Sequence, residues 1–268
     1  MEKILFIIYL QEECELAANT VRSYRASLDQ FFERFSEVNK YNLMQYKQQL
    51  IDEGKKPATV NLKITAMNKY CEFIRHPEYK VKKLKLVKTS FAENVITLEE
   101  YNHLLKCLME DGNERGYWMV RFLAQTGARV SEFVRLPRSC LESGYYDMPS
   151  KGRIRRIYVP DKLIEESREY FEKQKPSEYL FPSATGKELS MQSVRMNLER
   201  WGRKYGVRKN VMHPHSFRHL FAIQFLKKNK NIALLADLMG HADVSTTSIY
   251  LRLSRQEQAR QLNDTIDW

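Results

Sequence analysis

The residues that invite a chemical interpretation are a few cations and one tyrosine in the second half of the chain. Arg129 follows a glycine that breaks a helix and lies in an otherwise apolar neighbourhood. His215 and Arg218 stand three residues apart at the start of another helix, so they share one side of it. Tyr250 belongs to a later helix. Taken singly, each has an ordinary structural explanation, as an ion-paired arginine or a packing tyrosine.

Together these residue types suit one reaction, the breaking of a phosphodiester without metal or water. That reaction needs a nucleophile for phosphorus, fixed positive charge on the non-bridging oxygens and a proton for the departing 5′ oxygen. Arginine binds phosphate oxygens through its planar fork and stays charged at any working pH. Tyrosine can attack phosphorus, but its ordinary pKa of about 10 requires a cationic pocket or a nearby base. A lysine on a hairpin tip can deliver the proton, and histidine can shuttle protons near neutral pH.

Other common chemistries lack their motifs. The chain has no GxxxxGK[ST], GxGxxG, GxSxG or HExxH sequence. A zinc site among the histidines is disfavoured because no cysteine lies in that stretch, carboxylates are sparse and an arginine precedes His219; the histidines are His213, His215, His219 and His241. The 4 cysteines form no CxxC pair, which disfavours a zinc ribbon or a disulfide scaffold and fits a reducing cytosol. We therefore expect no metal and no cofactor.

Composition indicates a folded, basic protein. The 268 residues are 43% hydrophobic and include 44 Lys+Arg against 33 Asp+Glu, a net charge of +11. Residues 1–95 carry 16 basic and 12 acidic groups, and residues 96–268 carry 28 and 21, as expected if both parts touch one polyanion. The apolar run 4–10 is too short to span a bilayer, and the glutamates that follow it argue against a signal peptide. We expect no membrane partner.

The first segment reads as helical, and a basic stretch follows it. Asn19-Thr20 resembles an N-cap, and a second helix opens at Pro57 after Gly54 closes the one before. The expected core positions of the two helices are Val21, Tyr24, Leu28, Phe31, Phe32 and Phe35, and Val60, Leu62, Ile64, Met67 and Phe73. Residues 80–88 hold five lysines and no acid, which favours an extended linker near phosphates over a merely solvated one.

The second segment reads as mainly helical with one strand-rich interruption. Two short runs, 145–148 and 154–159, flank the turn sequence 149–152 and predict a hairpin. Helices are expected at about 161–174, 190–205, 216–228, 231–239 and 246–260.

These motifs, in this order, resemble those of the tyrosine recombinases of the phage-integrase and Xer type over nearly the whole chain. The family's TG-x-R-x-SE box matches 126–132, and its lysine in a KG turn matches Lys151-Gly152. Its H-x-x-R-H box matches 215–219, and its LGH-x-x-x-x-TT-x-x-Y box matches 239–250 with Met for Leu. Any one motif is weak, but four in order with the family's spacing are very specific.

The resemblance implies a fold and a division of the chain. The implied fold is mainly α with a small antiparallel β-sheet. A helical core-binding, SAM-like domain is expected at 1–79, a basic linker at 80–95, and an α+β catalytic domain with a C-terminal oligomerisation tail at 96–268. The chain is expected to begin at the core-binding domain, without a further arm-site-binding domain, which favours simple paired sites.

The resemblance also implies a mechanism residue by residue. Tyr250 attacks the scissile phosphate and gives a 3′-phosphotyrosyl protein and a free 5′-hydroxyl, which a partner strand's 5′-hydroxyl reverses without ATP or metal. The other implied roles are phosphate binding by Arg129, Arg218 and His241, protonation of the leaving oxygen by Lys151, proton transfer at the tyrosine by His215, and orientation of the site by Glu132. Lys151 is the least secure of these, because Arg153, Arg155 and Arg156 crowd the same hairpin and are candidate phosphate contacts.

The implied partner is double-stranded DNA with paired recombination sites. Candidate DNA contacts, for which a solvated surface is the alternative, are Arg22, Arg25, Lys63, Lys82, Lys83, Arg153, Arg195 and Arg203. The tail 256–268 ends in apolar residues and, by resemblance, docks on a neighbouring protomer in a tetramer; packing on its own domain is the alternative. A prokaryotic cytoplasm, at the nucleoid, is the implied location.

Two rival functions remain at this stage. A type IB topoisomerase shares the chemistry but relaxes supercoils without pairing two sites. A non-catalytic DNA-binding regulator could keep a recombinase shell, although all the expected catalytic residue types are present here. An RNA-binding protein is less favoured, since no RNP-type aromatic motif occurs.

Overall fold

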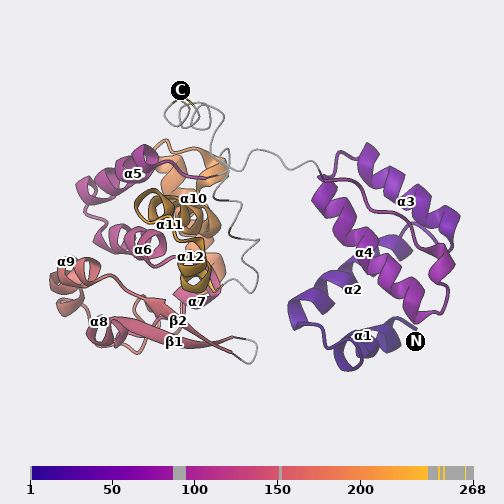
Figure 1. Cartoon of the computed structure of the whole chain (residues 1–268), viewed down its shortest axis with the longest axis horizontal. Helices are drawn as coiled ribbons and strands as arrows, with labels where there is room; N and C mark the ends of the chain where they lie inside the picture. The colour runs from indigo at the N-terminus through magenta and orange to yellow at the C-terminus, as the bar shows by residue number, and fades with distance from the viewer. Residues whose placement is uncertain are drawn as a thin grey trace. The chain divides into compact units, whose positions relative to one another are not determined.

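The computed structural model describes residues 2–86, 95–150 and 153–240, together with Thr247, Tyr250 and Asn263; the side chains at 150 and 153 are outside the description. The chain divides into two compact units, Met1–Thr89 and Ser90–Trp268. Figure 1 labels the elements of both. Within the described residues, no helix is both long and apolar enough to cross a membrane.

The first unit is a small helical bundle. Its elements are α1 (Glu2–Glu12), α2 (Ala18–Phe32), α3 (Lys40–Asp52), α4 (Pro57–Phe73) and the short 3-10 helix η1 (Pro77–Tyr79). Pro57 opens α4 as predicted, and Gly54 follows α3 with a φ of +68°, the left-handed conformation that ends helices. The predicted cap at Asn19-Thr20 is wrong, because the first turn of α2 closes earlier, on the carbonyl of Ala17.

The core of the first unit follows the predicted apolar faces with one error. Leu28 and Phe31 of α2 are buried, as are Ile64 and Met67 of α4. Leu62 is wrong as a core residue, since 45% of it is exposed. Val60, Ile64, Met67 and Cys71 of α4 are buried at steps of three or four positions, and Leu62 falls outside that stripe. The remaining predicted positions divide into buried Val21 and Val60 and half-buried Tyr24, Phe32, Phe35 and Phe73.

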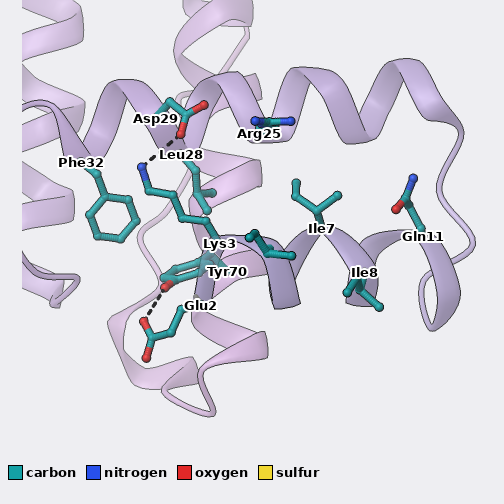
Figure 2. A pocket seen from close by; sticks show the side chains of 11 residues that line it. Glu2, Lys3, Ile7, Ile8, Gln11, Arg25, Leu28, Asp29, Phe32 and Tyr70 are labelled. Atoms are coloured by element: carbon teal, nitrogen blue, oxygen red, sulfur yellow. Dashed lines mark hydrogen bonds and ion pairs between the residues drawn. The ribbon is translucent and has the colours of Figure 1, made fainter.

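The apolar run at 4–10 belongs to α1, which turns Phe6 and Leu10 into the core. Polar contacts fasten this helix at its start: Lys3 pairs with Asp29 of α2, and the Tyr70 hydroxyl of α4 donates to Glu2 (Figure 2). A groove of about 820 Å³ lies beside α1 and α2. Arg25 is the only predicted site residue that lines it.

The start of the predicted linker packs onto the first unit. Val81 is buried in the core, and its backbone N–H and C=O both pair with the Asn68 side chain, at 3.0 and 2.9 Å. Asn61, two turns earlier on α4, holds the backbone of Leu84 in the same way, at 2.7 and 2.9 Å. Residues 80–84 are therefore ordered against α4, while Lys82 and Lys83 remain exposed.

The second unit surrounds α6 (Glu114–Thr126) with helices and carries a two-stranded hairpin. The hairpin pairs β1 (Tyr145–Ser150) with β2 (Arg153–Tyr158) in antiparallel register, from Tyr145 opposite Tyr158 to Ser150 opposite Arg153. The other described elements are α5 (Leu98–Glu110), α7 (Val130–Phe133), α8 (Cys140–Ser143), α9 (Asp161–Glu172), α10 (Met191–Lys204), η3 (Lys209–Val211), α11 (Pro214–Lys228) and α12 (Ile232–Met239).

These elements confirm the mainly helical fold with a small antiparallel sheet. The predicted hairpin is present. Its first strand extends further than expected, through residues 149 and 150, and its second begins and ends one residue earlier than expected, at 153 and 158. The helices predicted near 161, 190, 216 and 231 correspond to α9, α10, α11 and α12. The helix predicted at 246–260 lies outside the described residues except for Thr247 and Tyr250.

Candidate active site

Arg129 is presented by the turn between α6 and α7. Gly127 ends α6 with a φ of +60°, and a Cβ there would collide with the ring of Phe221, so the position demands glycine. The chain then enters α7, where the Glu132 carboxylate accepts the Arg129 backbone N–H at 2.6 Å and its Nη1 at 2.9 Å. The Arg129 side chain keeps 35% of its surface exposed. The predicted helix break therefore places a partly open guanidinium at a fixed point.

Arg218 is buried on α11, with only 2% of its surface exposed. Pro214 opens this helix, and His213 caps it by accepting the backbone N–H of Ser216. The Arg218 guanidinium donates to the carbonyl of Gly127 at 2.6 Å and to that of Met239. Burial, followed by the neighbouring charges of Arg129 and Arg155, lowers the pKa of Arg218 to about 9. The site thus concentrates positive charge where water is scarce, which favours an anion.

Glu132 is the carboxylate that these cations share. Its Oε1 accepts from Arg129, its Oε2 accepts from Nη1 of Arg155, and Nη1 of Arg218 lies 4.0 Å from Oε2. Burial alone would raise the pKa of Glu132, but the bonds and charges of Arg155 and Arg129 outweigh it and lower the pKa. One buried carboxylate thus organises three guanidinium groups.

The hairpin arginines do not act alike. Arg155 is 7% exposed and faces Glu132, so its guanidinium is not a surface phosphate contact. Arg156, the next residue of β2, is exposed and pairs with Asp147 at 2.8 and 2.6 Å. Strand geometry explains the difference, because successive side chains point to opposite faces. The Arg153 side chain lies outside the described residues, as do Lys151 and His241.

The C-terminal end of α12 supplies the remaining acceptors. The carbonyls of Leu238, Met239 and Gly240 accept from Arg155 (3.0 Å), Arg218 and Arg129 (2.8 Å), respectively. The last carbonyls of a helix have no partner within the helix and carry its negative dipole end. Gly240 caps α12 with a φ of +59°. All three guanidiniums are therefore fastened to one helix end as well as gathered around one carboxylate.

Tyr250 lies against this cluster. It is 9% exposed and packs with Ala222, Leu235 and Met239. Its hydroxyl is 2.7 Å from Nδ1 of His219. Burial raises the pKa of Tyr250 to about 12, although the charge of Arg218 opposes the rise. The phenol is therefore neutral in the protein without DNA.

Sequence reasoning gave His219 no role. The signal was available, because His219 is the second histidine of H-x-x-R-H and lies one helical turn after His215. The two imidazole rings stack, with centroids 5.6 Å apart. His215 itself is solvent-accessible, and partial desolvation by the surrounding protein, followed by the charge of Arg218, lowers its pKa. The histidine nearest the tyrosine hydroxyl is thus His219.

The predicted DNA contacts that can be located lie on helix surfaces and the basic stretch. Arg22 and Arg25 are exposed on α2, and Arg195 and Arg203 on α10. Lys63 of α4 is half-buried, and its ammonium contacts the side chain of Gln30. Within the part of the chain that the structure describes, no group of three or more His, Cys, Asp and Glu side chains is arranged to hold a metal ion.

A SAM-like helical bundle, followed by a helical unit with a hairpin and an Arg-Arg-Tyr cluster, is the architecture of a tyrosine recombinase. Residues 94–257 match the phage integrase family, and residues 4–77 match the phage integrase N-terminal SAM-like domain. The chain belongs to the phage integrase family, whose tyrosine recombinases cut and rejoin DNA strands.

Named relatives agree along nearly the whole chain. The tyrosine recombinase XerA of Pyrococcus furiosus is 29% identical, over 98% of this chain and 91% of its own length. The tyrosine recombinase XerD of Staphylococcus aureus is 26% identical over 98% of both. In fold, the Tn1549 transposon integrase, solved in complex with transposon right end DNA, aligns with a TM-score of 0.75 at 16% identity, over 100% of this chain and 99% of that one.

Proposed function

We propose that this recombinase acts site-specifically and uses Tyr250 as its nucleophile. The observation that carries the proposal is a pair of guanidiniums beside a buried tyrosine: Arg129 is hydrogen-bonded to Glu132, and Nη1 of Arg218 lies 4.0 Å from the same carboxylate. In this role the two arginines bind the non-bridging oxygens of the scissile phosphate. Glu132 orients them and takes no part in the bond changes.

The strand-cutting step is a transesterification. The Tyr250 oxygen forms a bond to phosphorus, the bond to the 5′ oxygen breaks, and a 3′-phosphotyrosine and a 5′-hydroxyl result. The phenol proton passes to His219, which lies 2.7 Å away, and His215 stacks behind that ring. Lys151 protonates the 5′ oxygen and His241 adds a phosphate hydrogen bond. The reverse reaction with another strand's 5′-hydroxyl rejoins DNA without ATP.

The two family matches, over residues 4–77 and 94–257, support a division of the chain into a DNA-binding part and a catalytic part. Residues 1–79 form the core-binding domain, 80–95 the basic linker and 96–268 the catalytic domain. The DNA backbone is contacted by Arg22, Arg25, Lys63, Lys82, Lys83, Arg153, Arg195 and Arg203. The exposure of Lys82 and Lys83 beside an ordered backbone supports their part in this set. The protein acts on paired sites in a prokaryotic cytoplasm, at the nucleoid.

A trapped covalent complex tests the nucleophile. Wild-type protein is incubated with a randomised duplex library that carries a nick near each candidate cleavage position, which traps covalent intermediates. EDTA is added, and adducts are isolated on denaturing gels. Wild type is expected to give an adduct whose DNA defines the site, and Tyr250→Phe none. An adduct formed equally by Tyr250→Phe would overturn the assignment. With the site known, exchange between two sites distinguishes recombination from supercoil relaxation.

Assembly is tested by shortening the chain. The proposed tetramer depends on the tail docking to a neighbouring protomer, so deleting the residues after Arg260 is expected to leave binding to a single site intact and to abolish synapsis. Gel-shift and paired-site assays measure the two properties separately. Unchanged recombination by the truncated protein would contradict the docking role.

A further inference from the structure

Arg155 lies outside the set of residues assigned to the phosphate, yet it occupies the centre of the cluster. The residue is 7% exposed, its Nη1 donates to Glu132 Oε2, and its Nη2 donates to the Leu238 carbonyl at 3.0 Å. Its Nε is buried without a hydrogen-bond partner among the described residues. Burying such a group is costly, so its position calls for a functional reason.

The contacts around Glu132 Oε2 indicate that reason. This oxygen accepts from Arg155 Nη1 and from the Arg129 backbone N–H, at 2.6 Å in the second case. Arg218 Nη1 stands 4.0 Å from the same oxygen, too far for a hydrogen bond. In a buried setting the nearest carboxylate attracts a guanidinium strongly. Without Arg155, Oε2 would be open to a hydrogen-bonded ion pair with Arg218, in place of the present 4.0 Å contact.

We propose that Arg155 is a positioning residue that occupies Glu132 Oε2 and so keeps the carboxylate from drawing Arg218 away from the position in which it would bind the scissile phosphate. The proposal rests on the proposed function, because it assigns Arg218 to the phosphate. In this role Arg155 acts through its bond to Glu132 and thereby on Arg218, rather than on the phosphate itself.

The charges of the cluster support this division. Three guanidiniums and one carboxylate sum to a charge of +2 for the groups bonded around Glu132. A phosphodiester carries one negative charge, and attack by a tyrosinate adds a second in the transition state. Removing Arg155 lowers the cluster to +1, whereas removing the charges of Arg155 and Glu132 together restores +2. The two changes should therefore compensate each other.

Arg155 also connects the cluster to the hairpin and to α12. It belongs to β2, four residues after Lys151, and its Nη2 holds the last turn of α12. A Cβ at Gly240 would collide with the Arg155 side chain, so glycine there makes room for the contact. Arg155 thus joins strand β2 of the hairpin to the C-terminal end of α12, whose carbonyls also accept from Arg129 and Arg218.

The first test needs no DNA. In a crystal structure of Arg155→Met, whose apolar side chain suits the buried site, Arg218 is expected to move into direct contact with Glu132, closing the 4.0 Å gap. An Arg218 that stays bonded to the Gly127 and Met239 carbonyls, still separated from Glu132, would overturn the proposal. Wild-type protein crystallised in the same way is the reference.

The second test is a double-mutant cycle. It measures the rate of covalent adduct formation on the nicked duplex that the wild-type protein selects from the library. At saturating protein, Arg155→Met is expected to slow adduct formation about 100-fold, the scale for losing one charge-stabilising donor. The double variant Arg155→Met/Glu132→Gln is expected to regain about tenfold over Arg155→Met, since the carboxylate that captures Arg218 is gone. Arg155→Lys, which keeps the charge, should stay within about tenfold of the wild type.

The controls separate this role from a folding defect and from failure of the proposed function. Arg168→Met removes an exposed arginine of α9, which has no part in the proposed site, and is expected to leave the rate unchanged. A residue that only supports the fold predicts a double variant as slow as Arg155→Met or slower, and that outcome overturns the proposal. If the wild type forms no Tyr250 adduct on any duplex, the proposed function fails instead, and the crystallographic arm still decides the role of Arg155.

Discussion

The arginine cluster of the second unit and the proposed DNA-contact cations of the first are held in opposite ways. In the second unit, Arg155 and Arg218 are buried, share Glu132 and donate to backbone carbonyls. In the first unit, Arg22 and Lys82 are exposed to solvent. Buried cations gain position and strength at the cost of desolvation, while exposed ones act through screened, additive attraction. Under the proposed function, this difference suits the cluster to chemistry at one phosphate and the exposed cations to affinity for many phosphates.

In the basic stretch of the first unit, hydrogen bonds fix the backbone and not the charged side chains. Asn61 and Asn68 each pair with both backbone groups of one residue in the basic stretch. The side chains of the neighbouring lysines, Lys82 and Lys83, are exposed to solvent, while the backbone on either side of them is held by hydrogen bonds. We therefore expect substitutions of the buried cluster in the second unit to change rates, and substitutions of exposed cations to change affinity and its dependence on salt.

The largest effect is expected from Arg218→Lys. Lysine lacks the planar fork and cannot serve Gly127, Met239 and a phosphate together. Strand cleavage at saturating protein should fall by about 10³-fold. Single-turnover adduct formation measures the rate, and a gel shift measures affinity, which should change little. The matched control Arg203→Lys changes an exposed arginine of α10 and should leave the rate intact. Equal losses of rate from both variants would contradict the distinction between buried and exposed cations.

Glu132→Gln should destabilise the protein by about 3 kcal/mol at neutral pH, because it leaves two buried guanidiniums, Arg155 and Arg218, and the partly exposed Arg129 without the carboxylate beside them. The pKa of Glu132 is lowered in the folded state. Its stabilisation is therefore complete above the ordinary glutamate pKa and is lost as the pH falls through the folded-state value. Denaturant unfolding from pH 7 to pH 3 should show the two proteins converging.

The control for that experiment is Glu53→Gln in the first unit. Arg34 also lowers the pKa of Glu53, through a hydrogen bond of 2.6 Å, but the pair lies at the surface. Only a small change in stability is expected there. A larger loss from Glu53→Gln than from Glu132→Gln would contradict the distinction between the units.

His219→Phe should slow adduct formation by about 100-fold, because the phenol loses its proton acceptor while ring packing is kept. His215→Phe should cost less, since that ring lies behind His219. The comparison is made with single-turnover rates at one pH and saturating protein. A greater loss for His215→Phe would return the proton-transfer role to His215, as the sequence resemblance implied.

Asn68→Ala is expected to weaken DNA binding a few-fold and to leave cleavage at saturation unchanged. It frees the Val81 backbone and with it the position of the neighbouring lysines. Binding isotherms on the selected duplex measure the effect. Gln45→Ala, which removes an exposed side-chain hydrogen bond on α3, is the control. A slower cleavage step in Asn68→Ala would contradict this expectation and show that the position of the basic stretch affects the cleavage rate as well as DNA affinity.

The smallest effect should come from Lys82→Ala. Losing one phosphate contact reduces the slope of log affinity against log salt by about 1. The slope is obtained from binding isotherms at several salt concentrations. Lys106→Ala, on the exposed side of α5, is the control and should keep the wild-type slope. An unchanged slope for Lys82→Ala would remove that lysine from the proposed DNA contacts.

Local signals were sufficient for the elements that frame the site. Gly127 and Gly240 both adopt the left-handed conformation that ends a helix, and the turn residues after Met148 mark the hairpin. These signals depend on backbone preferences that act within a few residues. They place Arg129 and Arg218 on the correct elements before any tertiary contact is known.

Tertiary contacts decided what local signals could not. On β2, Ile154 is 76% exposed whereas Arg155 is buried, the reverse of their hydropathy. Strand alternation alone leaves open which face is inward, and here the carboxylate of Glu132 selects the face that holds Arg155. The pairing of His219 with Tyr250 likewise joins residues 31 positions apart, which no local pattern specifies.

The end of α12 has a consequence for how this protein tolerates substitution. Its three carbonyls hold the arginines through main-chain atoms, so replacing the side chain of Leu238 or Met239 does not remove an acceptor. This latitude fits the methionine found where the family has leucine. An alanine scan along α12 would therefore not detect these main-chain hydrogen bonds to the arginines. Only a change in the chain path, such as Gly240→Ala, or an ester in place of a peptide bond would expose it.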